Sequence, residues 1–209
     1  WELCVETGLQ ALAIPEAQGG SGLGMTELML VLQAQGRALG QVPLWRHQLA
    51  AATVAQFADP SLQAWAEEAA AGRALLTLDL SGLFNAHGIQ LHGVETDGGW
   101  RVKGRVGALA LAEQSQAALL LVSVDGQPRL ALVELGDKAI THVPGRMTHG
   151  EAIADVHIDG LLIRAECLLP PAALDWLEPR SIAALAALQL GVSAEQIRRT
   201  VEYVTERRQ

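Results

Sequence analysis

The sequence predicts an α+β chain with N-terminal helices, a central antiparallel β barrel or sandwich, and the start of a C-terminal helical bundle. Helical spacing of apolar residues gives way to strand-like runs at Ala74 and returns after Pro171. No helical segment separates successive strand-like runs, so a parallel βαβ arrangement is disfavoured. We therefore expect a partial N-terminal helical domain at 1–72, a β domain at 73–169 and a partial C-terminal helical domain at 170–209.

Cap and turn residues delimit the helices expected in the first zone. Thr26 is a suitable N-cap for a helix that Gly40 would end. A second helix is expected at about 44–57 because apolar residues recur there at helical spacing. Asp59 and Pro60 then start a third helix, since Asp caps helices well and Pro fits the first helical position.

Five runs suited to β-strands follow, each bounded by turn residues. Asp97-Gly98-Gly99 and Asp125-Gly126 are typical of hairpin turns, since glycine tolerates the positive φ that such turns require. These turns predict antiparallel pairing between successive strands. The expected strands are 74–80, 100–103, 117–124, 129–135 and 153–158.

One long helix is expected over 172–209. From Pro179 onward it alone would run about 45 Å at 1.5 Å per residue. Its stretch Ile182–Leu190 is apolar nearly all round, which predicts burial against partner helices. We therefore expect a homo- or hetero-oligomer. Because the chain begins with Trp1 and stops within a helical pattern, we also expect truncation at both ends.

Composition and charge exclude several classes of function. Half of the 209 residues are hydrophobic, which suits a well-buried core. A net charge of -8 disfavours binding to nucleic acid or to an anionic membrane, and no apolar run reaches the about 20 residues needed for membrane insertion. Cys4, Cys167 and the six histidines lack metal-ligand spacing, so no metal site is predicted and the histidines are expected on the surface or in strands. A reducing cytoplasm is the expected location.

Sequence motifs at both ends and in the middle of the chain occur in an order that resembles a known family. Near the start, Gly8-Leu9, Ala13–Glu16 and Gly19–Gly24 occur in succession, and Tyr203–Gln209 lies at the end. In this order they resemble the GL…PEEYGGSGLG segment and the Y…RxQFG signature of acyl-CoA dehydrogenases. Looser likenesses cover the middle of the chain: Ala74–Thr77 to the start of ALTEPxxGSD, Gly99–Gly104 to GYxLNG, and Ile153–Ile158 to FxDVxVP.

The resemblance implies FAD as cofactor, with a binding set of Thr77, Ala108, Ala110, Arg207 and Gln209. Ala108 falls at the position of the family's flavin-packing Trp, and Ala110 at that of the hydroxyl residue near flavin N5. Arg207 would reach the dinucleotide of a neighbouring subunit. Because the two alanines offer neither an aromatic wall nor a side-chain donor, we expect FAD to be weakly bound or shared with a partner subunit.

The family's reaction removes a proton α to the carbonyl of a CoA thioester and passes a hydride from the β carbon to flavin N5; the electrons then leave to an electron-transfer acceptor. In most members the base is a Glu that would lie beyond Gln209. In others it falls at the position of Ser181, which is no carboxylate. Glu178, three residues earlier, is the candidate base that this chain offers.

Three functions follow from the resemblance. The first is α,β-dehydrogenation of an acyl-CoA thioester by a flavoprotein subunit. The second is a non-catalytic partner subunit that completes a neighbour's flavin site in a heteromeric acyl-CoA dehydrogenase, of the kind that acts on sterol side-chain thioesters. The third is a flavin monooxygenase or oxidase on the same fold, because fold alone does not fix the reaction.

Overall fold

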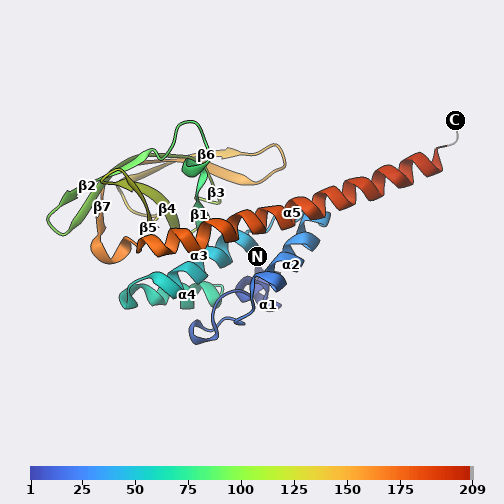
Figure 1. Cartoon of the computed structure of the whole chain (residues 1–209), viewed down its shortest axis with the longest axis horizontal. Coiled ribbons are helices and arrows are strands. Elements are labelled where there is room, and N and C mark those ends of the chain that lie inside the picture. Colours follow the sequence, from blue (N-terminus) through green and yellow to red (C-terminus); the bar gives the residue numbers. More distant parts are fainter. Residues whose placement is uncertain (208–209) are drawn as a thin grey trace.

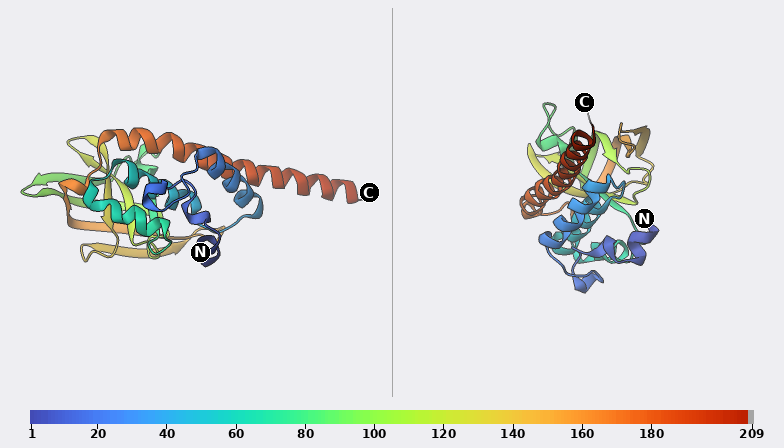
Figure 2. Two further views of the ribbon diagram at one scale, coloured as in Figure 1. Left: turned by 90° about the horizontal axis from the view of Figure 1, so that it is seen from below. Right: turned by 90° about the vertical axis from the view of Figure 1, so that its right-hand side faces the viewer.

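The computed structural model describes residues 1–207 and arranges them in three parts (Figure 1). Short helices of the N-terminal third lie beside a seven-stranded sheet, and one long helix, α5 (Pro171–Glu206), runs along both parts. The last turns of α5 project beyond the rest of the molecule, as Figure 2 also shows. No helix in the described range is long and apolar enough to span a membrane.

The three predicted N-terminal helices are present as α2 (Met25–Ala38), α3 (Leu44–Phe57) and α4 (Gln63–Ala70), and a short helix that was not predicted, α1 (Glu2–Glu6), precedes them. Asp59 caps a short 3-10 turn before α4, because its Oδ1 accepts the N–H of Ser61 at 2.9 Å. The prediction of Thr26 as an N-cap is wrong. Gly24 is the N-cap of α2, and its N–H donates to the Glu27 carboxylate at 2.9 Å, so the glutamate does the capping.

Seven strands form one open, mixed sheet: β1 (Leu76–Asp79), β2 (Leu91–Thr96), β3 (Gly99–Ala110), β4 (Ala117–Val124), β5 (Gln127–Glu134), β6 (Ile140–Arg146) and β7 (Ala152–Arg164). The strand order is β1-β4-β2-β3-β7-β6, with β5 beside β4. Of the expected barrel or sandwich, a closed barrel is not formed. The expectation of purely antiparallel pairing is wrong, since β1 and β2 pair parallel to β4. The β2–β3 hairpin provides the crossover between β1 and β4 that a helix provides in βαβ units.

Both predicted hairpin turns are present. Asp97-Gly98 joins β2 to β3, and Asp125-Gly126 joins β4 to β5 with φ of 52° and 74°. Positive φ at both central residues is the geometry that two-residue hairpins favour, because its twist matches that of the strands. The sequence did not predict β2 or β6: Pro144 and Gly145 interrupt the apolar pattern of β6, and β2 has one buried residue, Leu91.

Strand β4 divides the core into two clusters. Leu119 and Leu121 pack with the helices, whereas Leu120 and Val122 pack with the far half of the sheet. All four are buried, so the strand is covered on both faces, which explains its continuous apolar sequence.

The helix α5 is continuous through Pro179, and its buried residues from Ser181 onward are small ones. Ser181, Ala184, Ala187 and Gly191 face the body of the protein. Ile182, Leu185 and Leu190 are each about half exposed, at 50%, 48% and 56%, so their expected burial against partner helices stays a prediction. The close approach of α2 leaves room for small side chains only.

Candidate functional site

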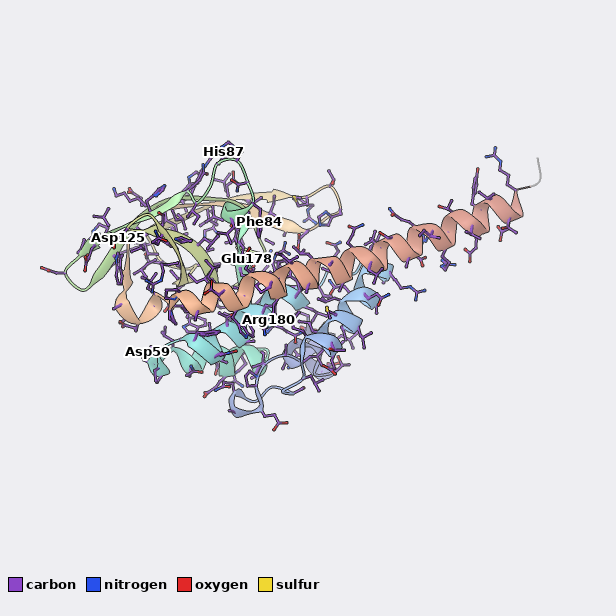
Figure 3. The ribbon with its side chains drawn as sticks, viewed as in Figure 1. Asp59, Phe84, His87, Asp125, Glu178 and Arg180 are labelled. Carbon is purple, nitrogen blue, oxygen red and sulfur yellow. The ribbon has the colours of Figure 1, made fainter. Side chains whose placement is uncertain are left out.

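A pocket of about 200 Å³ lies between α3, the end of β1 and the first half of α5. Figure 3 labels Phe84, one of its lining residues, on the loop after β1. A mainly apolar pocket with a few convergent polar groups is the usual form of a small-molecule site. The apolar lining consists of Trp45, Leu78, Leu80, Phe84, Ile182 and Leu185, and the polar lining of Arg46, Asp79, Ser81 and Ser181.

Ser181 places a neutral hydroxyl in this pocket. The residue is 5% exposed, and its Oγ has no hydrogen-bond partner within residues 1–207. A buried hydroxyl without a partner costs about 1–3 kcal/mol, which a ligand or water that accepts its hydrogen bond would recover. This is the position at which the resemblance would place a catalytic carboxylate, and serine is not a base of that kind.

Asp79 is a pocket residue that the sequence analysis missed. Its Oδ2 accepts the Ser81 hydroxyl at 2.9 Å and the Ser81 N–H at 3.3 Å. Burial raises the pKa of the Asp79 carboxyl, while the Ser81 hydrogen bonds and the charge of Arg46 act in the opposite direction. The Asp-x-Ser sequence after a strand is the signal that could have revealed this turn.

Arg46 joins the pocket to the hairpin between β6 and β7. Its Nη1 lies 2.7 Å from Glu151 Oε1, and its guanidinium stacks 4.7 Å from the centre of the Trp45 ring. Both ion-pair side chains are 22% exposed, so the pair is shielded in part from solvent. Arg46 is therefore held in place at the pocket by an element more than a hundred residues away in the sequence.

Two residues expected to face a flavin, Thr77 on β1 and Ala110 at the end of β3, are hydrogen-bonded to each other. Thr77 is fully buried, and its hydroxyl donates to the Ala110 carbonyl at 2.9 Å. The Ala110 side chain is also buried, at 3% exposure. The only side-chain proton available from this pair is thus already used inside the protein.

Ala108 lies in a β-bulge of β3 that Asp155 supports. Ala108 has a φ of 52°, a left-handed conformation that costs a residue with a Cβ about 1–2 kcal/mol. Its N–H donates to Asp155 Oδ1 at 2.8 Å, and the pairing of β3 with β7 shifts register between Val106 and Leu109. The bulge orders the backbone, but an exposed methyl group is all that Ala108 presents outward.

The remaining predicted site residues do not meet at this pocket. Glu178 is half-buried on α5, where Figure 3 labels it, but it is not among the residues that line the pocket. Arg207 is exposed directly after α5, and its Nη1 donates to the Tyr203 hydroxyl at 2.5 Å. Gln209 lies outside the described residues. The roles expected of these residues stay predictions.

One histidine departs from the expected surface or strand location. His47 is fully buried on helix α3. Within residues 1–207, no cluster of His, Cys, Asp and Glu side chains has an arrangement that could hold a metal ion. Cys167 is a half-buried free thiol, and burial raises its pKa, so it is poorly suited to act as a thiolate nucleophile.

Comparisons with known proteins agree with this geometry. Residues 1–73 match the family described as acyl-CoA dehydrogenase, N-terminal domain. A curated relative, acyl-CoA dehydrogenase FadE27 of Mycobacterium tuberculosis, is 29% identical over 212 residues, which cover 100% of this chain and 56% of the relative. The chain therefore spans little more than half the length of that relative.

Two solved structures share both fold and detectable sequence identity. The crystal structure of the ChsE4-ChsE5 complex from Mycobacterium tuberculosis matches with a TM-score of 0.91 and 28% identity, covering 100% of this chain and 58% of the other. The Tcur3481-Tcur3483 steroid ACAD matches with a TM-score of 0.87 and 29% identity, covering 99% and 57%. The chain thus has an acyl-CoA dehydrogenase-like fold, and its residues 1–73 match the N-terminal domain of that family.

Proposed function

We propose that this chain is the partner subunit of a heteromeric acyl-CoA dehydrogenase and does not form a complete flavin site of its own. The observation that carries this proposal is the closed hydrogen bond between Thr77 and Ala110. Together with the methyl group of Ala108, it leaves the expected flavin wall without an aromatic ring or an available side-chain donor. FAD therefore does not fit this wall as a tightly held group.

The pocket supports the same proposal through its chemistry. Abstraction of the proton α to a thioester needs a carboxylate base close to the substrate. Ser181 supplies a hydroxyl instead, and Glu178 lies outside the pocket lining. The pocket is suited to bind a ligand that has an apolar group and a hydrogen-bond acceptor. It is less suited to remove a proton from that ligand.

One observation favours the alternative of an active acyl-CoA dehydrogenase. Among the described lining residues, Asp79 is the only carboxylate, and the raised pKa of its carboxyl group is a property that catalytic bases often have. A flavin enzyme built on this chain would therefore use Asp79 or Glu178 as its base. This alternative would be favoured if the wild-type chain reduced flavin on addition of a thioester and the Asp79→Asn variant did not.

Arg207 supports a role toward a neighbouring subunit. It directly follows α5, whose last turns project beyond the rest of the molecule, away from the strands β1 and β3 that carry Thr77 and Ala108 (Figure 1). A guanidinium at that end would bind the phosphates of a dinucleotide held by another subunit instead of serving the flavin wall of its own chain.

The proposed substrate and partner follow from the relatives. One relative is described as a steroid ACAD and another as a complex of two chains, ChsE4 and ChsE5. We infer a CoA thioester with a bulky acyl group as substrate and a second acyl-CoA dehydrogenase-like chain as partner. The expected electron-transfer acceptor and cytoplasmic location stay predictions.

Flavin content is the decisive measurement. The chain purified alone should contain far less than one FAD per polypeptide and should not oxidise an acyl-CoA thioester, while a complex with an acyl-CoA dehydrogenase-like partner should retain FAD. Stoichiometric FAD and thioester turnover in the isolated chain would refute the partner role. Rapid reaction of dithionite-reduced flavin with oxygen, without thioester oxidation, would favour the monooxygenase or oxidase alternative.

Substitution of Arg207 tests the proposed contact directly. In the mixed complex, Arg207→Ala should lower FAD retention, because a charge-assisted contact to phosphate is lost. Arg199→Ala is the matched control, since Arg199 lies on the same helix and pairs with Glu195 at 2.8 Å. Equal FAD retention in wild type and Arg207→Ala would exclude the contact while leaving the partner role open to the flavin measurement.

A further inference from the structure

A second concavity, of about 570 Å³, opens on the sheet formed by β2, β3 and β7. It shares no lining residue with the pocket around Ser181. Figure 3 shows one of its residues, His87, on the loop between β1 and β2, away from α5. The polar lining consists of His87, Gln90, His92, Arg105 and His157. We propose that this concavity binds a soluble phosphate-bearing ligand.

Strand register places these side chains on one face of the sheet. Arg105 pairs with His157 across β3 and β7, and His92 pairs with Lys103 across β2 and β3. Residues directly opposite each other point to the same face, and so do residues two apart along a strand. Lys103 and Arg105 therefore share a face with His92 and His157.

One hydrogen bond orients the guanidinium of Arg105 and leaves its other N–H donors available. Its Nε donates to Gln90 Oε1 at 2.9 Å, and its Nη groups have no partner within residues 1–207. The rings of His87, His92 and His157 likewise form no hydrogen bond or ion pair in the described part of the chain. One fixed guanidinium with neighbouring imidazoles offers several converging N–H donors, which is the donor set that a phosphate group takes up.

The carboxylates on the same face are already engaged. Asp159 lies 2.8 Å from Lys103 Nζ, and this hydrogen bond lowers the pKa of the Asp159 carboxyl. Asp155 accepts the N–H of Ala108. No carboxylate of the described residues lines the concavity, in a protein whose net charge is -8. The arrangement therefore favours an anion over a cation, and it does not depend on the proposed function.

Titration of the whole chain with inorganic pyrophosphate tests the proposal, with binding followed by calorimetry and by the imidazole signals in 1H–15N spectra. We expect saturable binding that perturbs the signals of His92 and His157. Arg105→Gln should weaken binding about tenfold or more, whereas Arg101→Gln should not. Arg101 is the matched control because it lies on the same strand face but donates to the Gly160 carbonyl outside the concavity.

Further arms separate this site from general charge effects. Equal weakening by Arg101→Gln and Arg105→Gln would overturn the proposal, because it would mean diffuse attraction. Capture by phosphatidylglycerol vesicles without binding of free pyrophosphate would overturn it as well, since it would indicate a membrane surface.

Discussion

His47 is a buried histidine that three elements hold in its neutral form. Its Nδ1 accepts the N–H of Leu76 from β1, and its Nε2 contacts the Ala69 carbonyl of α4, each at 3.2 Å. The Trp1 ring packs edge-on against the imidazole with centroids 4.8 Å apart. The Nε2–H tautomer satisfies both hydrogen bonds. Burial lowers the pKa of His47 to about 4, despite the opposing effect of the Ala69 carbonyl.

Stability should therefore fall in mildly acid solution. The unfolded chain binds a proton at His47 near the ordinary pKa of 6.5, whereas the folded protein does so only near pH 4. Between these values the unfolded state holds more protons, so the free energy of unfolding decreases as pH falls. The loss is fully developed near pH 4 and amounts to about 3 kcal/mol, at about 1.4 kcal/mol per unit.

Urea unfolding at several pH values between 7.5 and 4 measures this effect. His47→Asn keeps an acceptor for the Leu76 N–H, so it should be less stable at pH 7 but lose less stability on acidification. His92→Asn, at an exposed histidine, is the control and should follow the wild-type curve. Parallel curves for wild type and His47→Asn would contradict the prediction.

At single residues, the sequence predicted positions better than contacts. The resemblance placed Thr77 and Ala110 at one site, and the two do meet, since the Thr77 hydroxyl donates to the Ala110 carbonyl. Asp155 could not be linked to Ala108 in the same way, since 47 residues separate the two and a bulge brings them together. The orientation of a side chain across a bulge depends on sheet register, which local spacing does not specify.

At the level of elements, two glycines set how α2 and α5 cross. A Cβ at Gly36 would lie 2.2 Å from the Leu188 carbonyl oxygen, and a Cβ at Gly191 would lie 2.1 Å from that of Gln33. Real Cβ atoms do not approach backbone oxygen so closely. The two backbones therefore pack directly against each other, and neither can yield as a flexible side chain would.

Gly191→Ala should destabilise the protein. Alanine has the better helix propensity by about 1 kcal/mol, but its methyl group forces α2 and α5 apart, and such overpacking costs about 1–3 kcal/mol. The backbone contact favours the upper part of that range, so we expect a net loss of about 1–2 kcal/mol in urea unfolding. Gly136→Ala is the control, because a Cβ at that position would have no atom within 4 Å. Equal stability of both variants would show that the crossing can adjust.

For individual elements, local sequence patterns predicted helices, strands and turns, but they did not predict how distant strands pair. The bounds of α3 and β4 and both hairpin turns follow from capping, apolar runs and glycine positions. The parallel pairing of β1 with β4 does not, because it joins strands that are separated by a complete hairpin. Likewise, the apolar pattern of Ile182–Leu190 could not indicate that the small residues of α5 face inward.

At the scale of the whole molecule, α5 carries an apolar stripe beyond its contact with α2. Ile197, Val201 and Val204 are 65%, 58% and 66% exposed, and their spacing of four and three residues places them on one side of the helix. Beside the stripe, Arg198 pairs with Glu195 and Glu202. An apolar stripe flanked by ion-paired side chains is typical of helices that pack against other helices.

The described chain should therefore associate in solution. Burying the stripe on a second helix removes apolar surface from water, and each large aliphatic side chain contributes about 1.5–3 kcal/mol when fully buried. Sedimentation velocity over a range of concentrations should show species larger than the monomer. Ile197→Glu combined with Val201→Glu should shift the distribution toward monomer, because two charges would have to be desolvated in the contact. Glu206→Lys, nine residues beyond Ile197 and therefore on the opposite, exposed side of the helix, should leave association unchanged. A wild-type chain that stays monomeric at every concentration would show that this stripe does not drive assembly.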